Sequence, residues 1–293
     1  MTAAPRTPLA GTPYLRALTP DHGALWRLAV AVVGSVAGLV VLPVLAFAAV
    51  FAGARLFGFP DYDFDLSDGV NAGEMLSLNL GLAALTGVAA VLARLLYGVR
   101  LRWLSSTKPG LRWRWLLTCV AISAVVWSLF LVAGTAGAYA TRDEPLDAWV
   151  WGFLVVVVLT TPLQAAGEEY VFRGLLLQGL GSTRLPVSIC CGLSGLLFAV
   201  AHLQFDPQLF ADRLLLGVAL AFLAVKTGGL EASIAVHTVK NVAVLVPTGL
   251  LGTVDDALDP QAVSWLPLIV DAVLLAIVVP WLLAVSRRRA AYN

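Results

Sequence analysis

The chain has 293 residues, of which 59% are hydrophobic and 13% charged, with a formal net charge of +1 at pH 7 and a mean hydropathy of +0.87. Soluble domains carry about 25% charged residues, so a water-soluble fold of this length would lack the polar surface to cover itself. The near-zero net charge gives no basis for nucleic-acid binding. The composition favours an integral membrane protein, whose solvent is the lipid bilayer.

Apolar runs of membrane-spanning length recur along the chain, and they predict an all-α, polytopic transmembrane bundle of about eight spans. The sixth run is short for a span. We expect one transmembrane domain at 28–286, between an N-terminal tail at 1–27 and a C-terminal tail at 287–293. The predicted spans lie near 28–53, 75–97, 115–139, 148–172, 187–203, 212–226, 230–250 and 264–285.

The charges alternate between successive loops. Basic residues stand in the N-terminal tail and after the second, fourth, sixth and eighth spans, whereas Arg213 is an exception in an outer loop. Because Lys and Arg concentrate in cytoplasmic loops, we expect both termini in the cytoplasm. Short loops and the lack of a cleavable signal pattern favour a bacterial cytoplasmic membrane. The loops between the basic ones are acidic, with Asp61, Asp63, Asp65, Asp68, Asp143, Glu144, Asp255, Asp256 and Asp259.

The first polar cluster in the apolar segments reads EEYVFR at 168–173. On a helix, Glu169 and Arg173 share a face and form an ion pair, while Glu168 points about 100° away. One carboxylate is then held ionised, and the other is left for chemistry. The alternative is that these charges mark the cytoplasmic end of a helix, but apolar residues on both sides weaken it.

Two further clusters contain histidines. Phe198 and His202 lie one turn apart, and so do His237 and Asn241, in a stretch where a lipid-facing placement would be costly. Taken alone, His202 is more often a satisfied polar residue at a helix end, and the pair of His237 and Asn241 is as readily a hydrogen bond between helices.

The combination is more specific than its parts, because two of the three histidines fall in these clusters. A carboxylate, two imidazoles and an amide from three helices would converge on one water molecule. We expect Glu168 to take a proton from this water and His202 to position it. His237 and Asn241 would then stabilise the oxyanion that forms when a peptide carbonyl is attacked.

The order EExxxR, FxxxH, HxxxN resembles the CPBP family of intramembrane peptidases, which includes the CAAX prenyl endopeptidases of the Rce1 type and the bacterial Abi proteins. The resemblance covers about residues 148–250, and the sequence KTGGL at 226–230 is similar to the family as well. It implies a helical membrane bundle that hydrolyses a peptide bond in a peptide or membrane protein. The matching residues are Glu168, His202, His237 and Asn241 as catalytic groups, with Glu169, Arg173 and Phe198 in support.

The resemblance favours a reaction without a cofactor, although Glu168, His202 and His237 would also suit zinc with an open fourth position. Two other functions stay open: a non-catalytic member of the family that confers bacteriocin immunity or acts as a scaffold, and a proton-coupled transporter. One feature fits poorly. Straight vertical helices would place His202 and Glu168 at different depths, unless the helices tilt.

Overall fold

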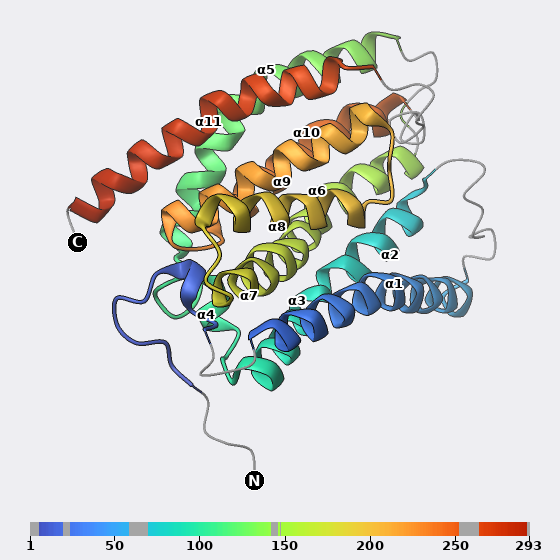
Figure 1. The fold of residues 1–293 in the computed structure, drawn as a ribbon. Coiled ribbons are helices and arrows are strands. Elements are labelled where there is room, and N and C mark those ends of the chain that lie inside the picture. The colour runs from blue at the N-terminus through green and yellow to red at the C-terminus, as the bar shows by residue number, and fades with distance from the viewer. Residues whose placement is uncertain are drawn as a thin grey trace.

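The computed structural model describes residues 6–19, 24–58, 70–141, 146, 148–251 and 264–291, whose regular structure is helical (Figure 1). Short 3₁₀- or π-helical segments, labelled η, interrupt or extend some of the α-helices. The elements are η1 (Tyr14–Arg16), α1 (Ala24–Leu56), α2 (Ala72–Ala83), α3 (Leu85–Leu92), η2 (Ala93–Tyr97), α4 (Arg102–Ser105), α5 (Trp113–Thr141), α6 (Ala148–Glu169), η3 (Tyr170–Leu176), α7 (Leu177–Ser182), α8 (Val187–Ala201), α9 (Pro207–Thr227), α10 (Glu231–Leu251) and α11 (Leu266–Ala291).

Seven helical stretches among the described residues are long and apolar enough to cross a membrane. Two of them are composite: Ala72–Tyr97 and Ala148–Ser182. The expected count of eight was wrong by this criterion, and the short element is the fifth one, not the sixth. With 15 residues, α8 extends about 22 Å, less than the roughly 30 Å hydrocarbon core. The sixth, α9, begins earlier than expected and has 21 residues.

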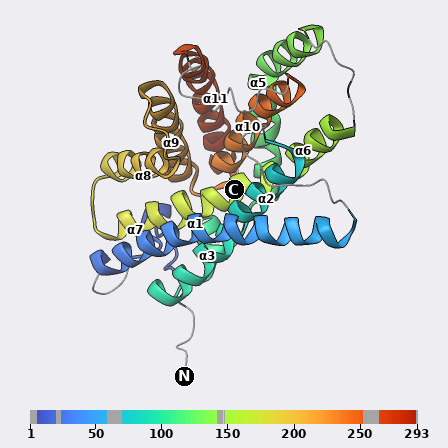
Figure 2. The same ribbon diagram turned by 90° about the vertical axis from the view of Figure 1, so that its right-hand side faces the viewer.

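Helix α10 lies at the centre of the bundle. It packs against α5, α6 and α9, and it is the most buried of the seven stretches. Figures 1 and 2 both place α5 and α11 on the side of the molecule opposite α1. The short α8 runs beside α9 and contacts η3, so the segments with the three sequence motifs meet around α10 and η3.

The predicted orientation stays a prediction. In Figure 1, α1 begins and α11 ends toward the same side of the bundle, which suits two termini on one side of a membrane. All the acidic loop residues used for that prediction lie outside the described residues: Asp61, Asp63, Asp65, Asp68, Asp143, Glu144, Asp255, Asp256 and Asp259.

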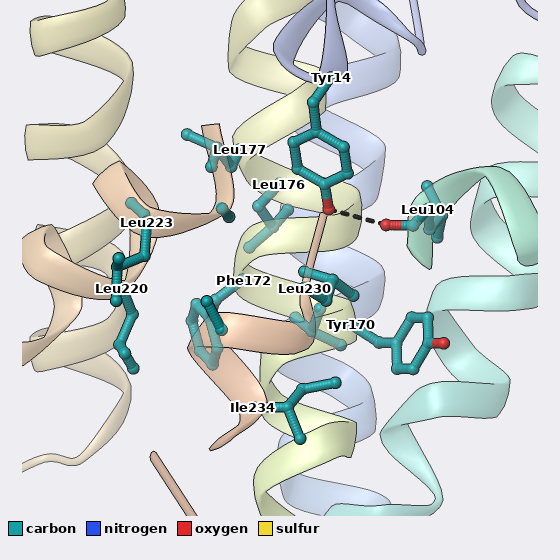
Figure 3. Packing of buried hydrophobic residues seen from close by; sticks show 14 of the residues in the cluster. Tyr14, Leu104, Tyr170, Phe172, Leu176, Leu177, Leu220, Leu223, Leu230 and Ile234 are labelled. Atoms are coloured by element: carbon teal, nitrogen blue, oxygen red, sulfur yellow. Dashed lines mark hydrogen bonds between the residues drawn. The ribbon is translucent and has the colours of Figure 1, made fainter. Parts of the chain in front are cut away.

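The described part of the expected N-terminal tail is docked on the bundle. Tyr14 and Leu15 are buried, and the Tyr14 hydroxyl shares its one hydrogen between the carbonyl oxygens of Leu104, at 2.7 Å (Figure 3), and of Arg173, at 3.2 Å. The Arg16 guanidinium donates to the carbonyls of Gly181 and Leu185. The segment therefore adds side-chain donors to backbone carbonyls in and beyond η3.

We expect Gly181→Ala to detach this segment. A Cβ at Gly181 would lie 1.9 Å from the Leu15 carbonyl oxygen, so backbone has to move. The expected result is faster cleavage near the N-terminus in limited proteolysis and a lower melting temperature. Gly192→Ala on α8 is the matched control, because no atom lies within 4 Å of its added Cβ and alanine favours helix by about 1 kcal/mol. Equal protease resistance of both variants would contradict the docking.

Candidate active site

Glu169 is the fully buried centre of the site. Its Oε1 accepts hydrogen bonds from Arg173 Nη1 at 2.7 Å and from His237 Nδ1 at 2.8 Å. The ion pair with Arg173, expected from the spacing of four residues, is thus confirmed. The contact with His237 was not expected, and it joins the first motif to the third. Glu169 therefore fixes the orientation of an imidazole in addition to pairing with arginine.

Arg173 lies in η3, a π-helical continuation of α6, and its side chain is fully buried. Its Nη2 donates to the Gly217 carbonyl on α9 at 3.2 Å, and its guanidinium carbon lies 4.3 Å from the centroid of the Phe198 ring. A buried charge is costly unless it is paired and hydrogen-bonded, and here an ion pair, a carbonyl and an aromatic ring compensate it. Wide helical turns of this kind are frequent at functional sites.

Glu168 differs from its neighbour although both are buried. Its Oε2 lies 3.4 Å from His237 Nε2 and accepts no hydrogen bond from the part of the chain that the structure describes. Glu168 and Glu169 were expected to face different neighbours, but both approach His237. His237 lies between the two carboxylates and presents one ring nitrogen to each.

Phe198 connects the two imidazoles. Its ring centroid is 4.6 Å from that of His202 and 5.6 Å from that of His237, in edge-on arrangements. His202 follows the last residue of α8, and its Nδ1 lies 2.8 Å from the Phe198 carbonyl oxygen. This contact makes Nδ1 the donor, so a neutral His202 ring keeps Nε2 as an acceptor.

The structure brings His202 to the site through Phe198. No ion pair joins His202 to Glu168 among the residues described. The expected conflict in depth is eased because α8 is short and its far end need not reach the opposite membrane surface. His202 is also less buried than His237, which places it at the more open edge of the site.

Asn241 contacts a residue that the motifs did not indicate. Its Nδ2 lies 3.3 Å from Gln164 Oε1, one turn before Glu168 on α6. Three polar contacts described here therefore connect α6 and α10: Gln164 with Asn241, Glu168 with His237, and Glu169 with His237. The sequence did contain a signal for Gln164. It lies in an apolar run four residues before Glu168, and residues four apart share a helix face.

The residues named for zinc do not form a metal site here. In the described ranges, no group of three or more His, Cys, Asp or Glu side chains is placed to hold a metal ion. The Nδ1 atoms of His237 and His202 are held by Glu169 and by the Phe198 carbonyl, so only their Nε2 atoms would be left as ligands. No step of the reaction below passes through a metal.

Comparisons with known proteins agree with the motifs. Residues 147–243 match the family model described as "Type II CAAX prenyl endopeptidase Rce1-like". The "Uncharacterized protein YyaK" of Bacillus subtilis (strain 168) is 25% identical over 201 residues, which cover 62% of this chain and 64% of that protein. The match thus spans less than two thirds of that relative. All three motifs fall within the matched residues 147–243, so this part of the chain is similar to the Rce1-like type II CAAX prenyl endopeptidases.

Proposed function

We propose that this protein is an intramembrane endopeptidase that hydrolyses a peptide bond with a water molecule activated by Glu168. The observation that carries the proposal is the unequal use of two adjacent carboxylates. Oε2 of each carboxylate lacks a hydrogen bond among the described residues, but Glu169 Oε1 accepts from both Arg173 and His237, whereas Glu168 has no arginine partner and only approaches His237 Nε2 at 3.4 Å. A general base needs such an unoccupied lone pair within reach of the proton that it removes.

The position of His202 supports a role in orienting the water. With Nδ1 donating to the Phe198 carbonyl, Nε2 accepts one hydrogen of the water while Glu168 accepts the other. A lone pair of the water oxygen is then aimed at the substrate carbonyl carbon. As the bond forms, the proton moves to Glu168, which afterwards delivers it to the leaving amine.

Asn241 and His237 are the proposed donors to the oxyanion. The side-chain amide of Asn241 has two N–H groups, and its contact with Gln164 uses one of them. His237 Nδ1 donates to Glu169, which orients the ring, and Nε2 serves as the donor to the oxyanion when the ring is an imidazolium. Donors held in place before the reaction stabilise the developing charge without reorganisation.

The substrate is proposed to be a peptide or membrane-protein segment that enters from the lipid phase. The test compares protein N-termini in the native host carrying either the wild type or Glu168→Ala. New N-termini that require Glu168 would name both the activity and the substrate. Identical N-termini in both strains would favour an immunity or scaffold role. Proton-coupled flux in proteoliposomes without cleavage would favour a transporter.

Chelation separates the metal-free reaction from the zinc alternative. We expect the purified protein to retain its cleavage rate within a factor of about two after prolonged treatment with EDTA or 1,10-phenanthroline, because its own carboxylate serves as the base. The measurement is the initial rate before and after treatment, with metal content checked in parallel. A rate that falls with the metal content and returns with added zinc would contradict this mechanism.

A further inference from the structure

A second buried charge cluster lies beside the site, built from three helices. Lys240 Nζ on α10 is 2.8 Å from Asp212 Oδ2 on α9 and 2.7 Å from Asp271 Oδ2 on α11. All three residues are buried. Asp212 also pairs with its neighbour Arg213, at 2.5 Å. The peptidase mechanism uses none of these groups.

Stability alone does not account for this cluster. Removing charges from water is costly, and the attraction within a buried pair often fails to exceed that cost. In a bilayer, polar contacts between helices are only modestly stabilising, so they offset little of that cost. Ionisable residues inside membrane helices are therefore candidates for function when their partners are known.

The link to the site is the rotation of α10 about its axis. Lys240 directly precedes Asn241 and comes three residues after His237, so all three move with the same two turns of helix. Lys240 anchors these turns to α9 and α11, whereas His237 and Asn241 contact side chains of α6. The ion pairs of Lys240 and the contacts of His237 and Asn241 thus fix α10 to different helices. A rotation of α10 about its axis would displace both sets of contacts.

We propose that Lys240, clamped between Asp212 and Asp271, is a positioning residue that sets the rotation of α10 and thereby aims His237 and Asn241 at the reacting carbonyl. The consequence for cleavage rests on the proposed function, but the consequence for His237 geometry does not. An ion pair in a low-dielectric interior resists displacement more steeply than apolar contacts do, and it specifies one register among several.

The decisive variant neutralises the whole cluster: Asp212→Asn, Lys240→Met and Asp271→Asn together. It leaves no unpaired charge among the three substituted residues and keeps side-chain volumes similar. Arg213 loses its carboxylate partner, but it is partly exposed and keeps its contact with Gln204 Oε1, so we expect the variant to fold with a melting temperature near that of the wild type. The readout is ¹⁵N NMR of histidine-labelled protein in nanodiscs. Because the chain has three histidines, single substitutions assign the His237 signals.

We expect the His237 Nδ1 and Nε2 resonances to shift or broaden in the triple variant as its contacts with Glu169 and Glu168 loosen. Cleavage, where measurable, should fall about 100-fold in kcat with KM nearly unchanged, because a misplacement of about 1 Å costs that much. Asp271→Asn alone keeps the pair of Lys240 and Asp212 and should shift the same resonances less. If the triple variant does not fold, Asp271→Asn replaces it as the test of the proposal.

Ser233→Ala is the matched control. It removes a neutral hydrogen bond of 2.8 Å between Ser233 on α10 and the Leu220 carbonyl on α9, and it should leave the His237 resonances in place. Unchanged His237 resonances in a folded cluster variant would overturn the proposal, whatever the cleavage rate. If the His237 resonances shift in a protein that never cleaves peptides, the positioning role of Lys240 is supported and only the proposed peptidase activity is rejected.

Discussion

Replacing Glu168 with glutamine is expected to abolish peptide-bond cleavage and to leave the fold intact. Glutamine has nearly the same shape but cannot accept the proton of the attacking water. General-base catalysis contributes about 10²- to 10⁴-fold, so the rate should fall by at least that range. Because Glu168 is buried and one of its oxygens lacks a hydrogen bond in the described structure, the neutral amide is expected to preserve or raise the melting temperature.

The measurement is the initial cleavage rate of purified protein in lipid, with the melting temperature of the same sample. Leu163→Ala is the control for expression and handling, because that side chain is exposed on the outer face of α6. A Glu168→Gln protein that still cleaves near the wild-type rate would rule out the assigned base. If the Glu168→Gln variant has lost both activity and stability, Glu168 is needed for folding.

Arg173→Met is expected to have the largest effect on stability. It leaves the Glu169 carboxylate buried with His237 as its remaining partner, and it removes the guanidinium from the Phe198 ring. Breaking a buried pair by removing one partner costs about 3–5 kcal/mol. We expect a clearly lower melting temperature, read from a thiol-reactive dye that reports exposure of the buried Cys119, Cys190 and Cys191.

A double-mutant cycle identifies the cause. Glu169→Gln combined with Arg173→Met removes both charges, so the double variant should be more stable than Arg173→Met alone. The recovered stability measures the penalty for an unpaired carboxylate. If the two single effects simply add, the ion pair is not what makes Arg173 important, and its contacts with Phe198 and Gly217 would carry the effect.

Contacts set by helical spacing could be predicted from sequence. The pairing of Glu169 with Arg173 and the proximity of Phe198 to His202 both follow from a separation of four residues, and both were confirmed. The motif segments proved to be mutually close because hydrophobic runs separated by short loops pack as neighbours. The residues that match the Rce1-like family model, 147–243, include all three motifs.

Contacts between helices could not be predicted in the same way. Nothing in the spacing tells that Glu169 also binds His237, since that depends on how α10 is rotated against α6. The cluster of Lys240 with Asp212 and Asp271 was missed for the same reason, although a lysine and an aspartate inside apolar runs were visible signals. The length of α8 was misjudged because apolar turn residues after Ala201 extend its hydrophobic run.

The docked N-terminal segment has a consequence for biogenesis. Tyr14 and its acceptor at Arg173 are 159 residues apart, so a ribosome adding about 5–20 residues per second makes the donor roughly 8–32 seconds before the acceptor. During that interval the segment lacks part of its native surface, because its partners at Arg173, Gly181 and Leu185 have not yet been synthesised. Its docking is therefore completed late in assembly, only after Glu168 and Glu169 have been synthesised.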